Sequence, residues 1–366
     1  MKIECVKEKF VDAIQKAERV TGKNLTTPVL KCIHLQAERN NLTIRATNLD
    51  LGIEINLPVK VEVPGLVAVP GAVLLGFVQN LQHDKNVTLE STNQNLSVST
   101  PLNSTVIKAL SHEEFPSIPS LTSEKTISIP AKEFIRGLKA VWYSSGTSQV
   151  KPELSSVFIH SEEDELVFVA TDSFRLAEKR VRMKKAREFP SILIPLKNIP
   201  EIIRILEEIS GEIEVAFTKN QISFSADGLY LTSRLVDGVF PDYKQILPKG
   251  FKTEAVVLKE DLISSLKIAH IFSDKFNQVS VSVRPSEKLF QLRTKNAEIG
   301  ENTNKLKGAI SGEDVDINFN HRYITDCFQS VDSDSVSLEF NGLSKPVVIR
   351  GVSDKTFMYL VMPMNK

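Results

Sequence analysis

The chain has 366 residues, of which 42% are hydrophobic and 25% charged, and its 45 basic side chains balance its 45 acidic ones. This composition is typical of a folded protein of two or three domains and excludes the disordered and fibrous classes. A net charge of zero gives no overall positive field, so any attraction for nucleic acid must be local. Because neither a signal-peptide pattern nor a run of 18 apolar residues occurs, we expect a cytoplasmic protein without membrane contact.

The first predicted element is a short strand followed by an amphipathic helix, and it occurs three times. The copies are residues 2–20, 125–143 and 253–272. In the first copy Phe10, Ile14 and Ala17 stand at i, i+4 and i+7, which places them on one face of a helix. The matching triplets of the other copies are Phe134, Leu138 and Val141, and Leu262, Leu266 and Ala269.

Three further elements recur in the same order along the chain. A strand with a tight loop occupies residues 42–55, 166–181 and 289–305; a strand, turn and second helix occupy 65–81, 191–206 and 315–331; and an alternating hairpin occupies 87–100, 213–226 and 336–351. Thr171 follows Thr47 by 124 residues, and Asn296 follows Asn48 by 248. A shared period through successive elements indicates triplication. We therefore predict an α+β fold of three repeats, each with two helices and antiparallel sheets, at residues 1–123, 124–249 and 250–366.

Patterns of known enzymes and cofactor sites are absent from the sequence. It contains no Walker A loop, GxGxxG, HExxH or GxSxG, and Cys5, Cys32 and Cys327 lack the spacing of metal ligands. Asp172 beside Ser173 is typical of a turn. We therefore predict no catalytic residue, metal or cofactor.

Four stretches resemble one known family. They are TTPVL at residues 26–30, VATDSFRLA at 169–177, SRLVDGVFPDYKQILP at 233–248 and YLVMPMNK at 359–366. They are similar to the β subunit of bacterial DNA polymerase III, the sliding clamp, and the resemblance runs from Met1 to Lys366. It implies three similar domains per subunit and a head-to-tail homodimeric ring lined by helices. It also implies a non-enzymatic processivity factor that encircles duplex DNA and tethers the replicative polymerase.

A clamp that slides should face the DNA phosphates with dispersed positive charge and read no sequence. Lys132, Arg136 and Lys139 stand at i, i+4 and i+7, opposite the apolar stripe of the second repeat. Where related clamps commonly carry a basic or aromatic residue, this chain has Asn24, Pro152 and Glu153. The expected DNA-binding residues are Lys23, Asn24, Lys132, Arg136, Lys139, Lys151 and Lys197.

The family also has a groove between its second and third domains that binds short linear peptides of polymerases, the clamp loader and repair proteins. The matching residues here are Leu154, Thr171, Ser173, Phe174, Arg175, Leu176, Pro241, Gln245, Ile246, Ser344, Pro346, Leu360, Met362, Pro363 and Met364. Phe174 stands where relatives often have a small residue or histidine. We expect Leu176, Ile246, Met362 and Met364 to be partly exposed, because a peptide site must be open. Leu360 and Met362 could instead form the core face of the last strand.

For ring closure we expect Ile271 and Phe272, at the end of the third-repeat helix, to pack on an edge strand of the next chain that holds Thr105 and Ile107. Two other classes of protein stay open at this point. One is an enzyme whose site lacks a recognisable motif, and the other is a repeat scaffold that neither forms a ring nor binds DNA. The mass in solution would discriminate, since a clamp is a dimer.

Overall fold

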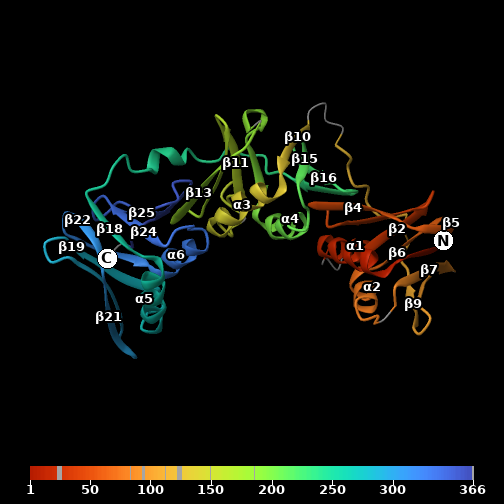
Figure 1. Cartoon of the computed structure of the whole chain (residues 1–366), viewed down its shortest axis with the longest axis horizontal. Helices are drawn as coiled ribbons and strands as arrows, with labels where there is room; N and C mark the ends of the chain where they lie inside the picture. Colours follow the sequence, from red (N-terminus) through yellow and green to blue (C-terminus); the bar gives the residue numbers. More distant parts are fainter. Residues whose placement is uncertain are drawn as a thin grey trace. The chain divides into compact units, whose positions relative to one another are not determined.

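The computed structural model describes residues 1–22, 27–82, 84–92, 95–111, 113–121, 126–148, 150–184 and 186–364. Over these residues the chain forms six α-helices, six short 3-10 helices and 26 strands in four sheets (Figure 1). Two helices fall in each repeat, which confirms the predicted α+β class. The chain divides into two compact units: Met1–Lys132 with Lys197–Leu235, and Glu133–Leu196 with Val236–Lys366.

The first unit contains two antiparallel sheets. The smaller has the order β5 (Lys60–Val63), β1 (Lys2–Val6), β7 (Asn86–Thr92), β8 (Asn95–Ser99) and β9 (Ser104–Lys108). The larger has the order β10 (Thr126–Pro130), β15 (Glu212–Phe217), β16 (Gln221–Ala226), β17 (Leu229–Arg234), β4 (Leu51–Pro58), β3 (Asn41–Thr47), β2 (Cys32–Glu38) and β6 (Gly65–Pro70). The β17–β4 pair joins strands of the second repeat to strands of the first. Helices α1 (Lys7–Val20), α2 (Gly71–Val78) and α4 (Ile199–Leu206) belong to this unit, and α1 contacts β3, β4 and α2.

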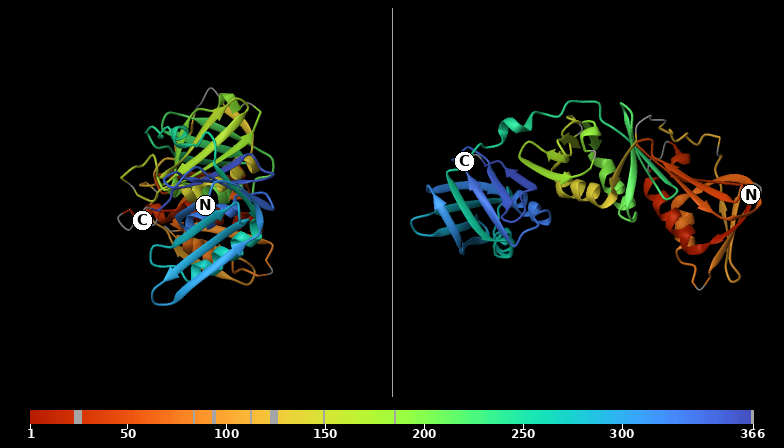
Figure 2. Two further views of the ribbon diagram at one scale, coloured as in Figure 1. Left: turned by 90° about the vertical axis from the view of Figure 1, so that its left-hand side faces the viewer. Right: turned by 45° about the horizontal axis from the view of Figure 1, so that its top comes forward.

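The second unit repeats this plan with nine and four strands. The larger sheet has the order β14 (Ile192–Pro195), β11 (Ser156–Glu162), β12 (Glu165–Thr171), β13 (Arg175–Arg182), β26 (Phe357–Val361), β25 (Val347–Gly351), β24 (Ser335–Phe340), β18 (Thr253–Leu258) and β22 (Gly308–Gly312). The smaller has β21 (Gly300–Leu306), β20 (Leu289–Asn296), β19 (Gln278–Arg284) and β23 (Val315–Asn320). Helix α5 (Lys259–Ile271) lies along β20 and β21 (Figure 2), and α6 (His321–Asp326) contacts α5. Helix α3 (Ala131–Val141) begins in the first unit and continues in the second.

Short 3-10 helices connect these elements. They are η1 (Pro28–Lys31), η2 (Trp142–Ser144), η3 (Ala186–Glu188), η4 (Leu196–Asn198), η5 (Tyr243–Ile246) and η6 (Cys327–Gln329). The predicted repeat boundary at residue 123 lies outside the described residues, and the two compact units divide the second repeat between them. The division into 1–123, 124–249 and 250–366 therefore stays a prediction.

The three predicted apolar helix stripes are confirmed, because all nine of their residues are buried. In α3 the packing is tight enough to require glycine at one position. A Cβ at Gly137 would lie 2.3 Å from Cε2 of Phe168, a fully buried ring that also packs edge-on against Phe134 with 5.6 Å between centroids. The helix can approach β12 this closely only without a side chain at residue 137.

The internal repeat extends to single hydrogen bonds. After β3, Asn48 Oδ1 accepts from the N–H groups of residues 50 and 51 at 3.0 and 2.8 Å; after β12, Asp172 Oδ1 accepts from those of residues 174 and 175, both at 2.9 Å. The residue that follows is left-handed in both loops, with φ 76° at Leu49 and 77° at Ser173. Such side-chain bonds stabilise tight turns. In both loops the carbonyl of the next residue accepts a hydrogen bond from the end of a later strand or just after it: Asp50 from Arg234 N of β17 (2.9 Å), and Phe174 from Met362 N, which follows β26 (2.8 Å).

Candidate functional site

Arg175 fixes the base of the second of these loops. Its Nε donates to Asp172 Oδ2 at 3.0 Å, and its Nη2 donates to the Tyr143 carbonyl at 2.8 Å. The guanidinium also pairs with Asp326 of α6 and lies 4.7 Å from the centre of the Tyr323 ring. Hydrogen bonds to charged groups and a cation–π contact hold the planar guanidinium in one orientation. Arg175 therefore ties the loop to α6.

Phe174, Met362 and Met364 form an apolar ledge on this loop. Phe174 is 60% exposed and stacks on Tyr323 with 6.5 Å between ring centroids. Met362 donates its N–H to the Phe174 carbonyl, and Met364 donates its N–H to the Asn318 carbonyl, both at 2.8 Å. Both methionine side chains are half-buried. Flexible thioether side chains beside an aromatic ring make an adaptable apolar surface.

All fifteen residues predicted for the peptide groove lie in the second unit. The exposed ones are Ser173, Phe174, Pro241, Gln245, Ile246 and Ser344. The half-buried ones are Leu154, Arg175, Met362, Pro363 and Met364. The buried ones are Thr171, Leu176, Pro346 and Leu360.

The expected exposure of Leu176 is wrong. Leu176 has no exposed surface, and Leu360 is also buried, because both belong to an apolar cluster with Phe240 and Tyr243. The alternative that Leu360 is a core residue of the last strand is therefore correct. Exposure of Ile246, at 51%, is confirmed. The open apolar surface is formed by Phe174, Ile246 and the methionines, with Leu176 and Leu360 beneath it.

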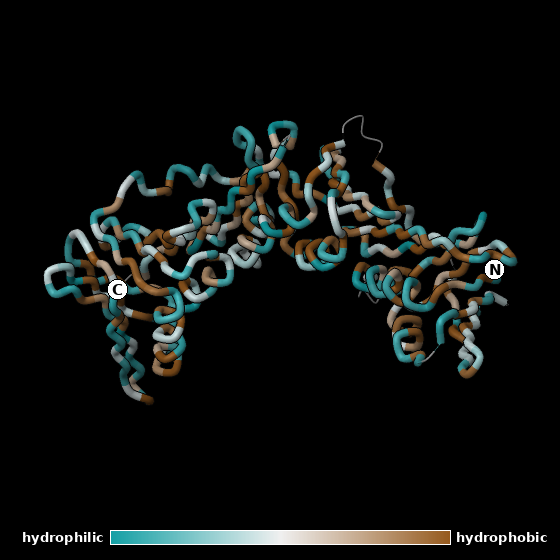
Figure 3. Tube along the Cα trace, viewed as in Figure 1, coloured by the Kyte–Doolittle hydropathy of each residue, from teal (hydrophilic) through white to brown (hydrophobic). Residues whose placement is uncertain are grey.

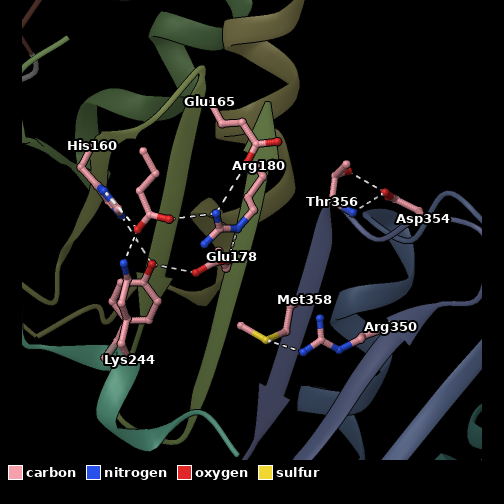
Figure 4. A network of polar contacts seen from close by, with 11 residues as sticks. His160, Glu165, Glu178, Arg180, Lys244, Arg350, Asp354, Thr356 and Met358 are labelled. Atoms are coloured by element: carbon pink, nitrogen blue, oxygen red, sulfur yellow. Dashed lines mark hydrogen bonds and ion pairs between the residues drawn. The ribbon is translucent and has the colours of Figure 1, made fainter. Parts of the chain in front are cut away.

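Residues 236–248, which we call the strap, run over the 9-stranded sheet and carry Ile246. Phe240 and Tyr243 of the strap are buried against the sheet, and Tyr243 donates its hydroxyl to Glu178 of β13 at 2.7 Å. Glu178 also accepts from Arg180 Nε at 2.8 Å (Figure 4). Sequence reasoning missed Glu178, because the run AEKRV shows only adjacent charges of both signs and its partner Tyr243 lies 65 residues away.

The basic residues expected to face DNA are exposed on α3. Lys132, Arg136 and Lys139 lie on the solvent side of that helix, and Arg136 lies 3.6 Å from Glu133. Lys151 is exposed as well, whereas Lys197 pairs with Asp50 at 2.6 Å. Lys23 and Asn24 lie outside the described residues. Exposed lysine and arginine side chains on one helix face suit contact with phosphates.

The residues expected at the ring interface need one correction. Strand β9 is the edge of the 5-stranded sheet, and Ile107 on it is 5% exposed, so it belongs to the core of its own unit. Strand alternation turns Val106 outward instead, with 65% of its surface exposed, while Thr105 is half-buried.

In the second unit, β21 is the edge of the 4-stranded sheet, and the adjoining end of α5 exposes Ile268 and Ile271 by 42% and 62%. Phe272 is half-buried. Figure 3 shows that β21 itself is mostly hydrophilic.

Groups of three or more histidine, cysteine, aspartate or glutamate side chains placed to hold a metal ion do not occur among the described residues. His321 Nε2 lies 3.3 Å from His270 Nδ1, and burial together with this neighbour lowers the pKa of His321 to about 4. Within the described part of the chain, no helix is both long and apolar enough to span a membrane.

Comparison with known proteins covers nearly the whole chain. Three family domains match in succession: DNA polymerase III beta subunit, N-terminal domain, at residues 1–119; central domain, at 128–242; and C-terminal domain, at 244–365. The beta sliding clamp of Synechococcus elongatus is 26% identical, with 100% of this chain and 99% of that protein covered.

Solved structures are similar over the same length. A DNA polymerase III beta subunit from Thermotoga maritima has a TM-score of 0.94 at 25% identity, and a DNA polymerase sliding clamp from Bacillus subtilis has 0.94 at 24%. Both comparisons cover 100% of this chain and 99% of the other. Three consecutive family domains therefore place the chain in the family of the DNA polymerase III beta subunit.

Proposed function

We propose that two copies of this chain form a ring-shaped sliding clamp, a processivity factor that encircles duplex DNA and tethers the replicative polymerase. The observation that carries this proposal is the match of all three family domains, in order, together with a fold shared over the full chain with solved clamps. The clamp holds DNA by topology and catalyses no reaction. A protein that works on bacterial chromosomal DNA acts in the cytoplasm, where we expect it.

We infer ring closure from one edge strand of each unit. Strands β9 and β21 are each the last strand of a sheet, so their outward N–H and C=O groups have no ladder partner within that sheet. We infer that β9 of one chain pairs with β21 of the next, with Val106 facing Ile271. The contact is heterologous, since each chain contributes one edge of each kind, and it closes only if the rotation from one chain to the next brings the second chain back onto the first.

DNA contact in the ring is sequence-independent. Lys132, Arg136 and Lys139 offer exposed positive charge, and contacts between such side chains and phosphates carry no sequence information. Lys151 and Lys197 would add to this surface, as would Lys23 and Asn24. Such contacts are individually weak and are weakened by salt, which allows sliding.

Partner proteins would bind through short linear peptides on the apolar ledge of the second unit. Phe174, Ile246, Met362 and Met364 expose apolar surface there, and such patches mark interaction sites. A leucine and an aromatic side chain of the peptide would pack on these residues, as we expect for the polymerase, the clamp loader and repair proteins. A methionine-rich surface can adapt to several different peptides.

The test is retention on DNA. Protein loaded by its clamp loader onto nicked circular DNA should stay bound through gel filtration and should be lost once a restriction enzyme linearises the circle. Equal loss from circular and linear DNA would contradict encirclement. Retention that depends on a DNA sequence would contradict sliding.

A further inference from the structure

We propose that Glu178 is a positioning residue for the peptide site: its buried carboxylate holds Tyr243, and thereby the strap, where Ile246 and Gln245 can meet a peptide. The inference rests on the proposed function of that surface. It adds Glu178, a buried residue outside the set of groove residues.

The strap is attached at its ends by its backbone and in its middle by side chains. Val236 N donates to the Leu193 carbonyl at 2.9 Å, and beyond the end of the strap Lys252 N donates to the Phe340 carbonyl at 2.9 Å. Between these points the backbone bond of Tyr243, to Pro241 at 2.7 Å, lies within the strap itself. Backbone hydrogen bonds inside the 3-10 turn η5 do not determine where the turn lies on the sheet below it.

Burial of apolar side chains alone does not determine that position either. Phe240 and Tyr243 pack in a cluster that includes Leu176, Met358 and Leu360, while Ile246 of the same segment faces solvent. The hydrophobic effect is non-directional, so burial of these rings does not by itself determine where Ile246 lies. A directional contact is needed to place Ile246.

Glu178 supplies this contact from an unusual position. Strand alternation puts it on the same face of β13 as Leu176, and its cross-strand neighbours Val169 and Met358 both belong to the apolar cluster. It is only 5% exposed. A carboxylate in such surroundings is strongly destabilising unless hydrogen-bonded. Tyr243 Oη donates to Glu178 Oε2 at 2.7 Å. The tyrosine side chain can make this hydrogen bond in only one position on the sheet.

Further charged residues bind the other carboxylate oxygen of Glu178 and the strap residue Lys244 (Figure 4). Arg180 donates from Nε to Glu178 at 2.8 Å and from Nη1 to Glu162 at 2.8 Å. Glu162 also pairs with Lys244, the strap residue after Tyr243. Two consecutive residues of η5 are thus bound to carboxylates of the sheet, and Gln245 and Ile246 follow directly.

Tyr243 remains a donor under all working conditions. Burial, and after it the Glu178 carboxylate, raises the pKa of Tyr243 above its ordinary value. His160 Nε2 lies 3.4 Å from the same hydroxyl oxygen and can donate to it. The hydroxyl is therefore protonated and directed at Glu178.

Three variants of the full-length dimer separate positioning from mere stability. Tyr243→Phe keeps the buried ring and removes the donor. In that variant the buried Glu178 carboxylate loses its tyrosine donor. The double variant Tyr243→Phe/Glu178→Met removes this carboxylate as well, so its urea unfolding midpoint should return toward that of the wild type. Thr356→Val is the control, because it removes the 2.6 Å hydrogen bond from Lys179, the neighbour of Glu178 on β13, without touching the strap.

The probe is a fluorescein-labelled ten-residue peptide ending in Leu-Phe, followed by fluorescence anisotropy. Tyr243→Phe should weaken binding about tenfold or more, the effect of losing one hydrogen bond to a charged acceptor. The double variant should bind as weakly even though its stability is restored, and Thr356→Val should bind like the wild type. Recovery of affinity together with stability in the double variant would overturn the proposal, because Glu178 would then have only a structural role.

Hydrogen exchange of residues 240–247 separates this inference from the proposed function. Exchange there should be faster in Tyr243→Phe and unchanged in Thr356→Val. If the wild type fails to bind the peptide, peptide recognition at this surface is refuted, and the exchange result alone decides whether Glu178 positions the strap. Unchanged exchange in Tyr243→Phe would overturn that role.

Discussion

Replacing Ile268 and Ile271 with lysine should convert the dimer into monomers. Full burial of an isoleucine side chain contributes about 1.5–3 kcal/mol. Scaled by the exposed fractions of 42% and 62%, the two residues contribute roughly 1.5–3 kcal/mol to each interface. A two-chain ring has two interfaces, so the loss is about 3–6 kcal/mol, or two to four orders of magnitude in the dissociation constant.

Sedimentation velocity at micromolar concentration measures this directly. The wild type should sediment as a species of twice 40.8 kDa, and the double lysine variant should sediment at 40.8 kDa. Thr218→Lys, which adds a charge at an exposed residue after β15 and away from α5, is the control and should remain dimeric. A dimer of unchanged stability in the Ile268/Ile271 variant would refute the placement of the interface at the end of α5.

Three further predictions concern packing, the peptide site and pH. Gly137→Ala should lower the free energy of unfolding by about 1–2 kcal/mol in urea titrations, because the clash with Phe168 outweighs the gain of about 1 kcal/mol in helix propensity; a stabilised variant would contradict the tight α3 packing. Deleting residues 362–366 should abolish binding of the Leu-Phe peptide and leave the dimer intact by sedimentation; equal affinity in the truncated dimer would exclude this segment from the site. His321 has a folded pKa of about 4, against 6.5 for an ordinary histidine, so between these pH values the unfolded state binds more protons than the folded one. The free energy of unfolding should therefore fall as the pH drops through this window, by up to about 3 kcal/mol. His321→Gln should remove most of this slope in pH-dependent unfolding, and an unaltered slope would show that other groups cause it.

The repeat and the helix faces were predictable because local spacing determines them. Phe10, Ile14 and Ala17 are buried as their period requires, and the loops after Thr47 and Thr171 agree down to the left-handed residue two positions after each threonine. Such features depend on residues close together in the chain. They can be predicted without knowing which distant segments pack against them.

The errors concern residues whose surroundings come from distant segments. Leu176 was expected to be partly exposed in the peptide groove. It is instead buried under Phe240 and Tyr243 of the strap, more than 60 residues later in the chain. Ile107 and Val106 are both apolar, so the pattern could not decide which of them faces the core. Glu178 carried no signal at all, because a buried carboxylate among apolar neighbours is recognised only once Tyr243 is found above it.

Electron microscopy of the purified protein tests the central claim most directly. The account predicts class averages of a closed ring of two chains, with a central hole wide enough for duplex DNA. In the presence of a nicked plasmid and the clamp loader, density for the duplex should pass through that hole. Open arcs, monomers, or DNA bound only to the outer surface would contradict the account.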